Sequence, residues 1–261
     1  MFTKAKDGFS SADLKLFAIL FMLLDHIGAI VIGGYLMQSG FLSPDGFYVL
    51  PGTPEPDLAR WLYYIEIPLR LAGRIAFPLF AFLIVQGFFH TRSRKNYLLR
   101  LAAFDLISEI PFYLAVSLIE EGSRNVYFTL ALGLLCIWGL ELVKEETAAR
   151  PVLAVPGALA VLLSCCVAAW YIDSDYSYGG VLCIAAFYLF RNDPVCGAAA
   201  AGAILTLLNP FGECAAFFCI FFISRYNGQK GSLPLGKYFF YAFYPGHLLL
   251  LYGIAMLILK R

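Results

Sequence analysis

The chain alternates between long runs of apolar residues and short stretches rich in charges, prolines or glycines. A helix needs roughly 20 predominantly apolar residues to cross a hydrocarbon layer of about 30 Å. Hydropathy and flanking charges together predict about nine such helices, and any count from eight to ten fits the pattern. The predicted spans are 14–37, 61–90, 96–117, 125–144, 151–172, 179–191, 195–209, 212–227 and 237–259. The sixth and seventh runs are short for a full crossing, so we expect them to be broken, tilted or partly re-entrant.

Composition leads to the same fold class. Of the 261 residues, 61% are hydrophobic and 14% are charged, whereas soluble domains average about 45–50% apolar and about 25% charged residues. The apolar runs leave no room for a soluble domain, so residues 1–261 are predicted to form a single all-α domain, a polytopic helical bundle in a membrane. The N-terminus lacks the short apolar core and cleavage site of a removable signal peptide, so the first helix is expected to act as a signal anchor.

Charge and cysteine usage argue against a nucleic-acid-binding protein and against a protein held together by disulfides or a metal ion. The formal net charge is +1, and no basic domain is present that would bind nucleic acid. The seven cysteines lie in or beside apolar runs, show no C-x-x-C spacing and are odd in number. This pattern is typical of small buried hydrophobic side chains, so we expect neither disulfides nor a metal site.

The distribution of lysine and arginine predicts the orientation in the membrane. Cytoplasmic loops are richer in these residues than loops on the other side. One set of helix ends carries Lys4, Lys6, Lys15, Arg92, Arg94, Lys95, Arg100, Lys144, Arg150, Arg191, Arg225, Lys230 and Lys237. The other set carries Arg60, Arg124, Lys260 and Arg261. The N-terminus is therefore predicted to be cytoplasmic, and the proline-rich loop at about 38–60 to form an extracytoplasmic lid or cap.

The first helix carries ionisable residues at membrane depth, in the stretch "LLDHIGAI". Such a group costs at least about 2.5–3.5 kcal/mol to insert, which makes it a functional candidate. A neutral His26 would be available as a proton acceptor, or would instead form an interhelical hydrogen bond. Lys15 lies eleven residues earlier, on the same face and about 16 Å away along the axis, at the cytoplasmic entrance. Asp25 points about 100° away from His26, so it either serves the site or pairs with an arginine of another helix.

The second and third spans carry further charges with helical spacing. Glu66, Arg70 and Arg74 form one stripe, in which Glu66 is expected to neutralise Arg70. Pro78 frees the backbone carbonyl of Arg74 and is expected to kink the helix there. Arg74 either stabilises negative charge in a site or serves as a structural partner of Asp25, Asp105 or Glu109.

Asp105 and Glu109 share one face of the third span. Two buried carboxylates need cations nearby if both are to remain ionised. They either balance Arg74 and Arg100, or they orient His26 and relay its proton.

The remaining candidates lie at helix ends and in the last span. His247 follows Tyr244 and Pro245 and either lines the same cavity as His26 or forms an interhelical hydrogen bond. Asn125 and Thr129 begin the fourth helix and are candidates for binding a substrate at the opposite mouth. Three cations after His90 set the topology or bind phosphates of a cofactor; they are Arg92, Arg94 and Lys95.

Several of these segments resemble the TraX family, whose founding member acetylates the N-terminal amine of a conjugative pilin. The resemblance rests on "LKLFAILFMLLDHIGAI", "LRLAGRIAFPLFAFLIVQGFFHTRSRKNYLLRLAAFDLISEIPF", "NVYFTLALGLL" and "FYPGHLLLLY". The basic residue and the histidine of the first helix are also similar to the pattern of transmembrane acyltransferases that use cytosolic acyl-CoA. This resemblance implies that Lys15 binds acetyl-CoA, that His26 is the catalytic base and that the protein resides in a bacterial inner membrane.

Sequence therefore predicts an integral membrane acyltransferase that transfers acetyl groups from cytosolic acetyl-CoA to an amine or hydroxyl of a peptide, lipid or glycan. His26 would accept the proton of the acceptor, and Arg74 would stabilise negative charge. A proton-coupled transporter is the alternative, because the same buried charges would also suit a transport pathway. An intramembrane hydrolase is disfavoured, because the chain has neither G-x-S-x-G nor H-E-x-x-H. A noncatalytic scaffold stays open, and the sequence does not indicate an oligomeric state.

Overall fold

The computed structural model describes residues 8–43, 57–119, 123–232 and 238–259. Apart from two isolated β-bridges, the regular secondary structure of these residues is helical. The elements in chain order are α1 (Ser11–His26), η1 (Ile27–Gly33), α2 (Gly34–Gln38), α3 (Asp57–Gly73), α4 (Ala76–His90), α5 (Arg94–Val116), α6 (Val126–Glu146), η2 (Pro151–Leu153), α7 (Ala154–Tyr171), α8 (Ser177–Leu189), α9 (Pro194–Leu208), α10 (Pro210–Glu213), η3 (Cys214–Phe218), α11 (Cys219–Ser224) and α12 (Phe239–Leu259). The predicted all-α membrane bundle is confirmed.

Each predicted apolar run contains helix, but among the described residues fewer helices than runs are both long and apolar enough for a complete crossing. Five helical segments among the described residues are long and apolar enough to span a membrane; they are Ser11–Gln38, Asp57–His90, Val126–Glu146, Pro151–Tyr171 and Phe239–Leu259. Helices α8 and α9 have 13 and 15 residues, which corresponds to roughly 20–22 Å at 1.5 Å per residue. A count of nine crossings is therefore not confirmed. The centre of the predicted outer loop, residues 44–56, lies outside the described residues.

The first span begins with a capping box and changes its helical type in the middle. The Ser10 side chain accepts a hydrogen bond from the backbone N–H of Asp13, and the Asp13 carboxylate accepts one from Ser10, which satisfies donors that a helix start leaves free. After His26 the backbone continues as the π-helix η1. Short π-helical segments in α-helices occur frequently at functional sites, and this one begins at the residue after the buried histidine.

The second span is interrupted where Pro78 predicts a kink. Helix α3 ends at Gly73, and two turn residues, Arg74 and Ile75, separate it from α4. Their backbone N–H groups donate to carbonyls three residues earlier, at Leu71 and Ala72. The break exposes the side chain of Arg74 to the neighbouring helices, as the missing N–H of a proline in the next turn would lead one to expect.

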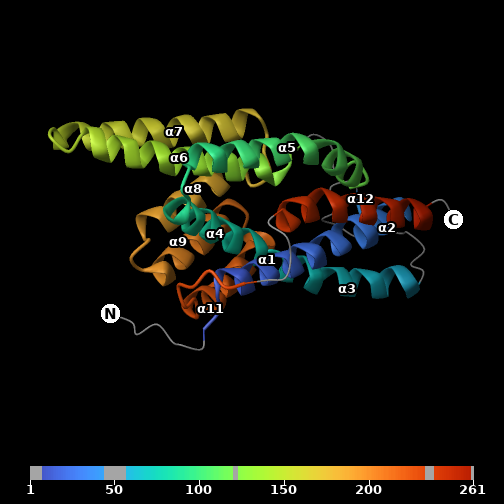
Figure 1. The fold of residues 1–261 in the computed structure, drawn as a ribbon. Coiled ribbons are helices and arrows are strands. Elements are labelled where there is room, and N and C mark those ends of the chain that lie inside the picture. The colour runs from blue at the N-terminus through green and yellow to red at the C-terminus, as the bar shows by residue number, and fades with distance from the viewer. Residues whose placement is uncertain (1–7, 44–56, 120–122, 233–237, 260–261) are drawn as a thin grey trace.

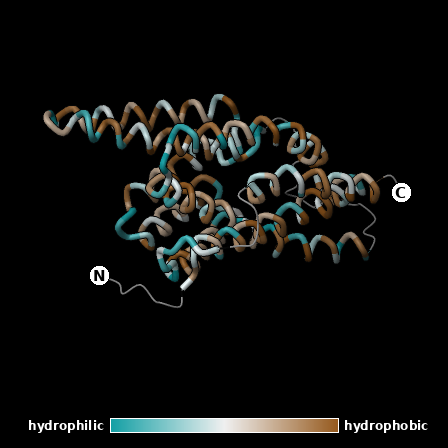
Figure 2. The backbone as a smooth tube through the Cα atoms, in the orientation of Figure 1, coloured by the Kyte–Doolittle hydropathy of each residue, from teal (hydrophilic) through white to brown (hydrophobic). Residues whose placement is uncertain are grey.

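The helices lie roughly side by side in two groups (Figure 1). In one group, the continuous helix α1–η1–α2 contacts both α3 and α12. In the other group, the antiparallel pair α6 and α7 extends beyond the rest of the bundle, α8 packs beneath this pair, and α9 packs against α8. Helix α4 lies between the two groups, and most of its side chains are buried. Hydrophobic residues dominate the lengths of the helices, and hydrophilic residues gather mainly at turns and helix ends (Figure 2).

The turn between α7 and α8 reaches the break in the second span. Tyr176 stacks on Phe77 of α4 with ring centroids 4.0 Å apart. The start of α6 holds the same turn, because the backbone of Arg124 exchanges hydrogen bonds with Asp173 and Asp175. The turn before α8 and the end of α9 line one cavity together with Arg74. That these two runs are broken, tilted or partly re-entrant stays a prediction.

Candidate functional site

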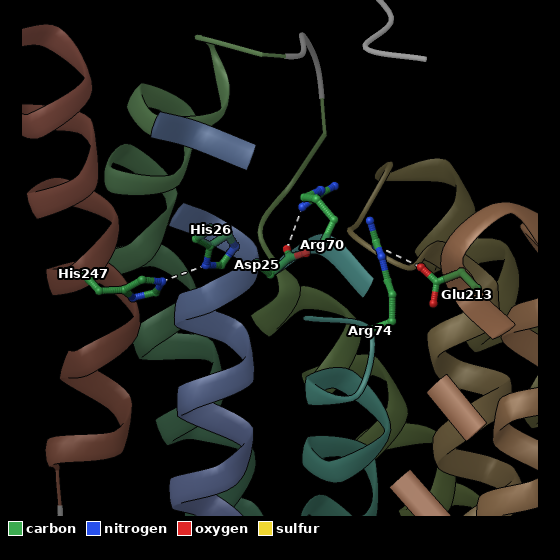
Figure 3. Close-up of polar contacts among 6 residues, drawn as sticks. All are labelled: Asp25, His26, Arg70, Arg74, Glu213 and His247. Carbon is green, nitrogen blue, oxygen red and sulfur yellow. Dashed lines mark hydrogen bonds and ion pairs between the residues drawn. The ribbon is translucent and has the colours of Figure 1, made fainter. Parts of the chain in front are cut away.

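A row of buried or half-buried polar side chains crosses the bundle at one level (Figure 3). Every member comes from an otherwise apolar segment of the chain. The row runs from α12 through α1 and α3 to α10 and consists of His247, His26, Asp25, Arg70, Arg74 and Glu213. It lies at the helical irregularities described above, since α1 ends at the histidine and the break in the second span begins at Gly73.

The two histidines form a direct hydrogen bond. His26 Nδ1 lies 2.7 Å from His247 Nε2, and His247 Nδ1 lies 2.8 Å from the carbonyl oxygen of Phe243. A carbonyl oxygen only accepts, so Nδ1 of His247 carries the hydrogen and Nε2 of a neutral His247 is an acceptor. His26 therefore donates from Nδ1. This assignment leaves Nε2 of a neutral His26 with a free lone pair, which is the state of a base.

His247 is held in place by its own helix. Its ring stacks on Phe243, one turn earlier, with centroids 5.0 Å apart and an interplanar angle of 12°. The side chain is 5% exposed. Of the two alternatives for His247, the interhelical hydrogen bond is the one found, and among the described residues it is not part of a cavity wall. Its geometry is that of a residue that orients His26.

Asp25 pairs with an arginine of the neighbouring helix, which was one of its two expected roles. Its carboxylate lies 2.8 Å from Arg70 Nη1. The pairing depends on Gly73, because a Cβ added there would lie 2.2 Å from the Cβ of Asp25. Arg70 was expected to be neutralised by Glu66, and its ion pair instead connects α3 to α1.

Arg74 pairs with an acid that sequence analysis did not single out. Its Nη1 lies 2.9 Å from Oε1 of Glu213, a residue that is 5% exposed. The expected structural partners Asp25, Asp105 and Glu109 were wrong. Glu213 is the lone acid in a long apolar stretch, and insertion cost alone would have marked it as a candidate.

Asp105 and Glu109 belong to a separate cluster at the start of α6. Glu109 forms an ion pair with Arg124 and accepts a hydrogen bond of 2.8 Å from Nδ2 of Asn125. The same amide donates to the backbone carbonyl of Asp105 at 3.1 Å. The expected balance with Arg74 is therefore not found, and no hydrogen bond joins either acid to His26 within the described part of the chain. The hydrogen-bond partner of His26 is His247.

Asn125 and Thr129 are buried and have structural partners. The Asn125 side chain caps α6 by accepting from the backbone N–H of Tyr127. Thr129 Oγ1 donates to the carbonyl of Asp175 and lies 3.0 Å from Ser174 Oγ. Both side chains are fully buried. The described linings of the cavities below do not include them, so the geometry gives them the roles of a cap and a tie between α6 and the α7–α8 turn.

A cavity of about 410 Å³ opens beside the N-terminal end of α1. Cavities of about 300–1,000 Å³ are typical of small-molecule sites. Three cations contribute to its lining, namely Lys15, Arg100 and Lys230. Its walls are largely aromatic and aliphatic, and they reach Met22 of α1 and Tyr244 of α12. The cavity therefore combines a basic entrance with an apolar interior.

Tyr244 stands between this cavity and the histidines. Its ring centroid lies 6.2 Å from that of His26 and 5.7 Å from that of His247. His26 itself is not among the described lining residues. Tyr244 is therefore the lining residue that connects the cavity to the two histidine rings, and its predicted contact with a substrate stays a prediction.

The three cations after His90 lie outside the described lining of the cavity. Arg92 and Lys95 are exposed. The guanidinium of Arg94 lies 4.3 Å from the centroid of the Phe88 ring. Arg100 and Lys230 line the cavity together with Lys15. From the sequence, Lys230 was a topology signal, and Arg100 was a topology signal and a possible partner of Asp105 and Glu109.

These features define a polytopic helical membrane protein in which a hydrogen-bonded histidine pair lies next to a cavity with basic residues at its entrance. The chain belongs to the TraX protein family, whose model matches residues 10–255. It is 31% identical over 272 residues to a probable fimbrial assembly protein, FimC of serogroup H1, from Dichelobacter nodosus, and the match covers 95% of this chain and 96% of that protein. No solved structure matches the chain.

Proposed function

We propose that this protein is an integral membrane acyltransferase that takes acetyl groups from cytosolic acetyl-CoA and transfers them to an amine or hydroxyl. The observation that carries the proposal is the cavity, which leads from Lys15, Arg100 and Lys230 to Tyr244, a residue in contact with both histidine rings. Acetyl-CoA has a phosphate-rich head and a narrow, less polar arm that ends in the thioester. Cations suit the phosphates, and the apolar interior suits the arm.

His26 acts as the general base in this mechanism. The acceptor attacks the thioester carbonyl, Nε2 of His26 takes the proton that the acceptor loses, and the thiolate of CoA leaves and recovers that proton. The hydrogen bond from Nδ1 of His26 to His247 fixes the tautomer that leaves Nε2 free, and it strengthens when His26 becomes positively charged. General base catalysis contributes about 10²–10⁴-fold in rate.

The other predicted site residues take supporting roles. Asp25 and Arg70 hold α1 against α3 next to the histidine. Arg74 faces away from the donor cavity, toward Glu213 and a second cavity, so we assign the donor phosphates to Lys15, Arg100 and Lys230. This chemistry needs no metal ion.

The location follows from the same features. The ends of α4 and α11 and the starts of α1 and α5 lie toward one side of the bundle (Figure 1), and the sequence places most lysines and arginines at these ends. We propose a bacterial inner membrane, with the N-terminus and the donor cavity on the cytoplasmic side. The acceptor is membrane-associated or extracytoplasmic. Similarity to a probable fimbrial assembly protein favours a pilin-like peptide among the candidate acceptors.

Two measurements test this function. Isothermal titration calorimetry on the purified protein in detergent should detect acetyl-CoA binding in the wild type and in His26→Ala. Mass spectrometry of cells with and without the protein should find a peptide, lipid or glycan that loses an acetyl mass, and His26→Ala should give the same loss. Absence of acetyl-CoA binding, or normal acetylation in His26→Ala cells, would reject the proposal.

A transporter is the second candidate, because the row of ionisable groups lies between two cavities. Such rows serve as ion pathways in membrane transporters. Proteoliposomes distinguish the candidates. A transporter would move protons or substrate without CoA, whereas the acyltransferase would bind CoA and give no flux.

A further inference from the structure

A second cavity, of about 300 Å³, lies on the other side of the polar row from the histidines. It is formed by the break after α3, the α7–α8 turn, the end of α9 and α10. Its lining includes the exposed residues Tyr178, Leu208 and Asn209. The cavity therefore opens at the protein surface, and its inner wall carries the ion pair of Arg74 and Glu213.

The charges at this cavity do not balance. Arg70 and Arg74 are the two cations of the row, and each pairs with one carboxylate. Asp175 is the third carboxylate of the region, lines the cavity together with Glu213 and has no ion-pair partner among the described residues. With all groups ionised the region carries one uncompensated negative charge, and a buried charge without a partner is costly.

Glu213 also presents an unused acceptor. Its Oε1 receives the bond from Arg74, whereas its Oε2 is buried without a hydrogen-bond partner. Buried polar atoms without partners are uncommon in folded proteins and call for a physical explanation. An incoming hydrogen-bond donor with a positive charge would satisfy both this oxygen and the charge excess.

The remaining walls indicate what else the ligand carries. Tyr176 and Tyr178 contribute aromatic rings, and Leu205 and Leu208 contribute aliphatic side chains. Aromatic faces attract organic cations, whereas a small hydrated metal ion prefers an all-oxygen shell. We infer that the second cavity binds a primary alkylammonium group, whose N–H donors reach Glu213 and Asp175 and whose alkyl chain lies against the tyrosines and leucines.

The backbone of the cavity wall supports a functional role. Tyr176 and Ser177 of the wall have φ values of 58° and 43°, and Asp173, on the same turn but outside the described lining, has 52°. Residues other than glycine adopt this region at an energetic cost, and such residues cluster at binding sites.

A primary ammonium has two natural sources in a membrane, the headgroup of phosphatidylethanolamine and the amine of a peptide. Amine binding in this cavity does not depend on the proposed function. The further statement that the bound amine is the acceptor of acetyl transfer does rest on the proposed function.

The site should respond to pH near neutrality. Burial raises the pKa of Asp175 to about 7, against the opposing effect of Arg74. The other groups that act on it are Asp25 of α1, Glu213 of α10 and the backbone of Tyr176. A cation binds the carboxylate form, so affinity should rise as the pH increases through 7 and Asp175 loses its proton. Alkylammonium ions remain protonated in this range, because their pKa is about 10, as for lysine.

Calorimetry with hexylammonium on the purified protein in detergent tests the inference, with 1-hexanol as the uncharged control. We expect hexylammonium to bind and hexanol to bind at least tenfold more weakly. Asp175→Asn should weaken hexylammonium binding at pH 8 at least tenfold and remove the dependence on pH between 6 and 8. Asp173→Asn is the matched control, since Asp173 is exposed on the same turn and is not among the described lining residues.

Asp175→Glu keeps the charge and should restore most of the affinity, which separates loss of the ligand from loss of the fold. Equal affinity in wild type and Asp175→Asn, or equal binding of hexanol and hexylammonium, would overturn the inference. In nanodiscs, competition by phosphatidylethanolamine but not phosphatidylcholine identifies the headgroup as the source, and no competition identifies a peptide amine. The amine titration contains no CoA, so the two proposals can fail separately. A protein that binds CoA but not the amine rejects this inference alone. A protein that binds the amine but not CoA rejects the acyltransferase alone.

Discussion

His26 Nδ1 and His247 Nε2 lie 2.7 Å apart, although the two residues are separated by almost the whole chain. The hydrogen bond joins α1 to α12 and connects to the backbone of Phe243. The carbonyl oxygen of Phe243 only accepts, so the hydrogen of His247 lies on Nδ1. The donor and the acceptor of the bond between the two histidines are thereby determined. His26 is the donor, and its other nitrogen is free to act as a base.

The first prediction uses this direction. In His247→Gln the amide oxygen can still accept from Nδ1 of His26, whereas His247→Leu removes the acceptor. A hydrogen bond to a charged group contributes about 1.5–3 kcal/mol, so His247→Leu should lower the rate of acetyl transfer by roughly 10–150-fold. His247→Gln should retain much of the activity. The rate is measured by mass spectrometry of the acetylated product over time.

The control for the histidine pair is Leu250→Ala, since Leu250 is exposed on the same helix as His247 and is not among the described residues that line either cavity. It should leave the rate unchanged. If His247→Leu and His247→Gln had the same rate, the hydrogen bond would not matter for catalysis.

The entrance of the donor cavity gives the second prediction. Lys15→Gln, Arg100→Gln and Lys230→Gln should each weaken CoA binding, and the loss should shrink at high salt because it is electrostatic. Exposed charge pairs contribute about 0.2–1 kcal/mol, so we expect about 1.5- to 5-fold per substitution and more than tenfold for the triple variant. Titration calorimetry with CoA measures this directly.

Lys95→Gln is the control for these cations, because Lys95 is exposed and is not among the described residues that line the cavity. A loss of affinity as large as that of Lys15→Gln would move the donor site to the α4–α5 turn. That outcome would favour the original sequence-based assignment of Arg92, Arg94 and Lys95.

Much of the fold could be predicted because it depends on hydropathy and on local signals. The apolar runs give the helices, and Pro78 gives the break at Arg74. The number of crossings could not be predicted in the same way. An apolar run of 13 residues, such as α8, is equally hydrophobic whether or not it crosses the membrane completely. Its packing against α4 and α6 determines where it lies.

The candidate site shows the same limit. Spacing along one helix placed Lys15 and His26 on one face, because helical geometry is local. Spacing cannot choose partners between helices, and this is where the expectations for Arg74, Asp105 and Glu109 were wrong. Each acid needed a cation within a few ångströms, and the packing of α10 against the break supplied Glu213 for Arg74.

The third prediction concerns the close contact of α1 and α3. In Gly73→Ala the new methyl group would meet the side chain of Asp25, at 2.2 Å from its Cβ. Forcing extra atoms into a packed interior costs about 1–3 kcal/mol, so the thermal unfolding temperature in detergent should fall and acetyl transfer should decrease. Gly253→Ala is the control, because nothing lies within 4 Å of the added atom. A Gly73→Ala variant as stable as the wild type would mean that the helices are farther apart.

The fourth prediction compares the stability of variants that lack Arg74, Glu213 or both members of this ion pair. Arg74→Leu leaves the buried carboxylate of Glu213 without its partner, and breaking a buried pair from one side costs about 3–5 kcal/mol. Glu213→Leu should destabilise the protein for the same reason. The double variant removes both charges, and such replacements are often neutral or stabilising. Its stability should therefore return close to that of the wild type.

Chemical unfolding in detergent of all four proteins gives the coupling energy between the two residues. Additive losses in the double variant would mean that Arg74 and Glu213 do not interact. Hexylammonium binding by the double variant carries a second test, because Asp175 then becomes the main charge of the second cavity. If the pair serves stability alone, the stable double variant should bind the amine as the wild type does. If Glu213 contacts the ligand, affinity should remain reduced although stability is restored.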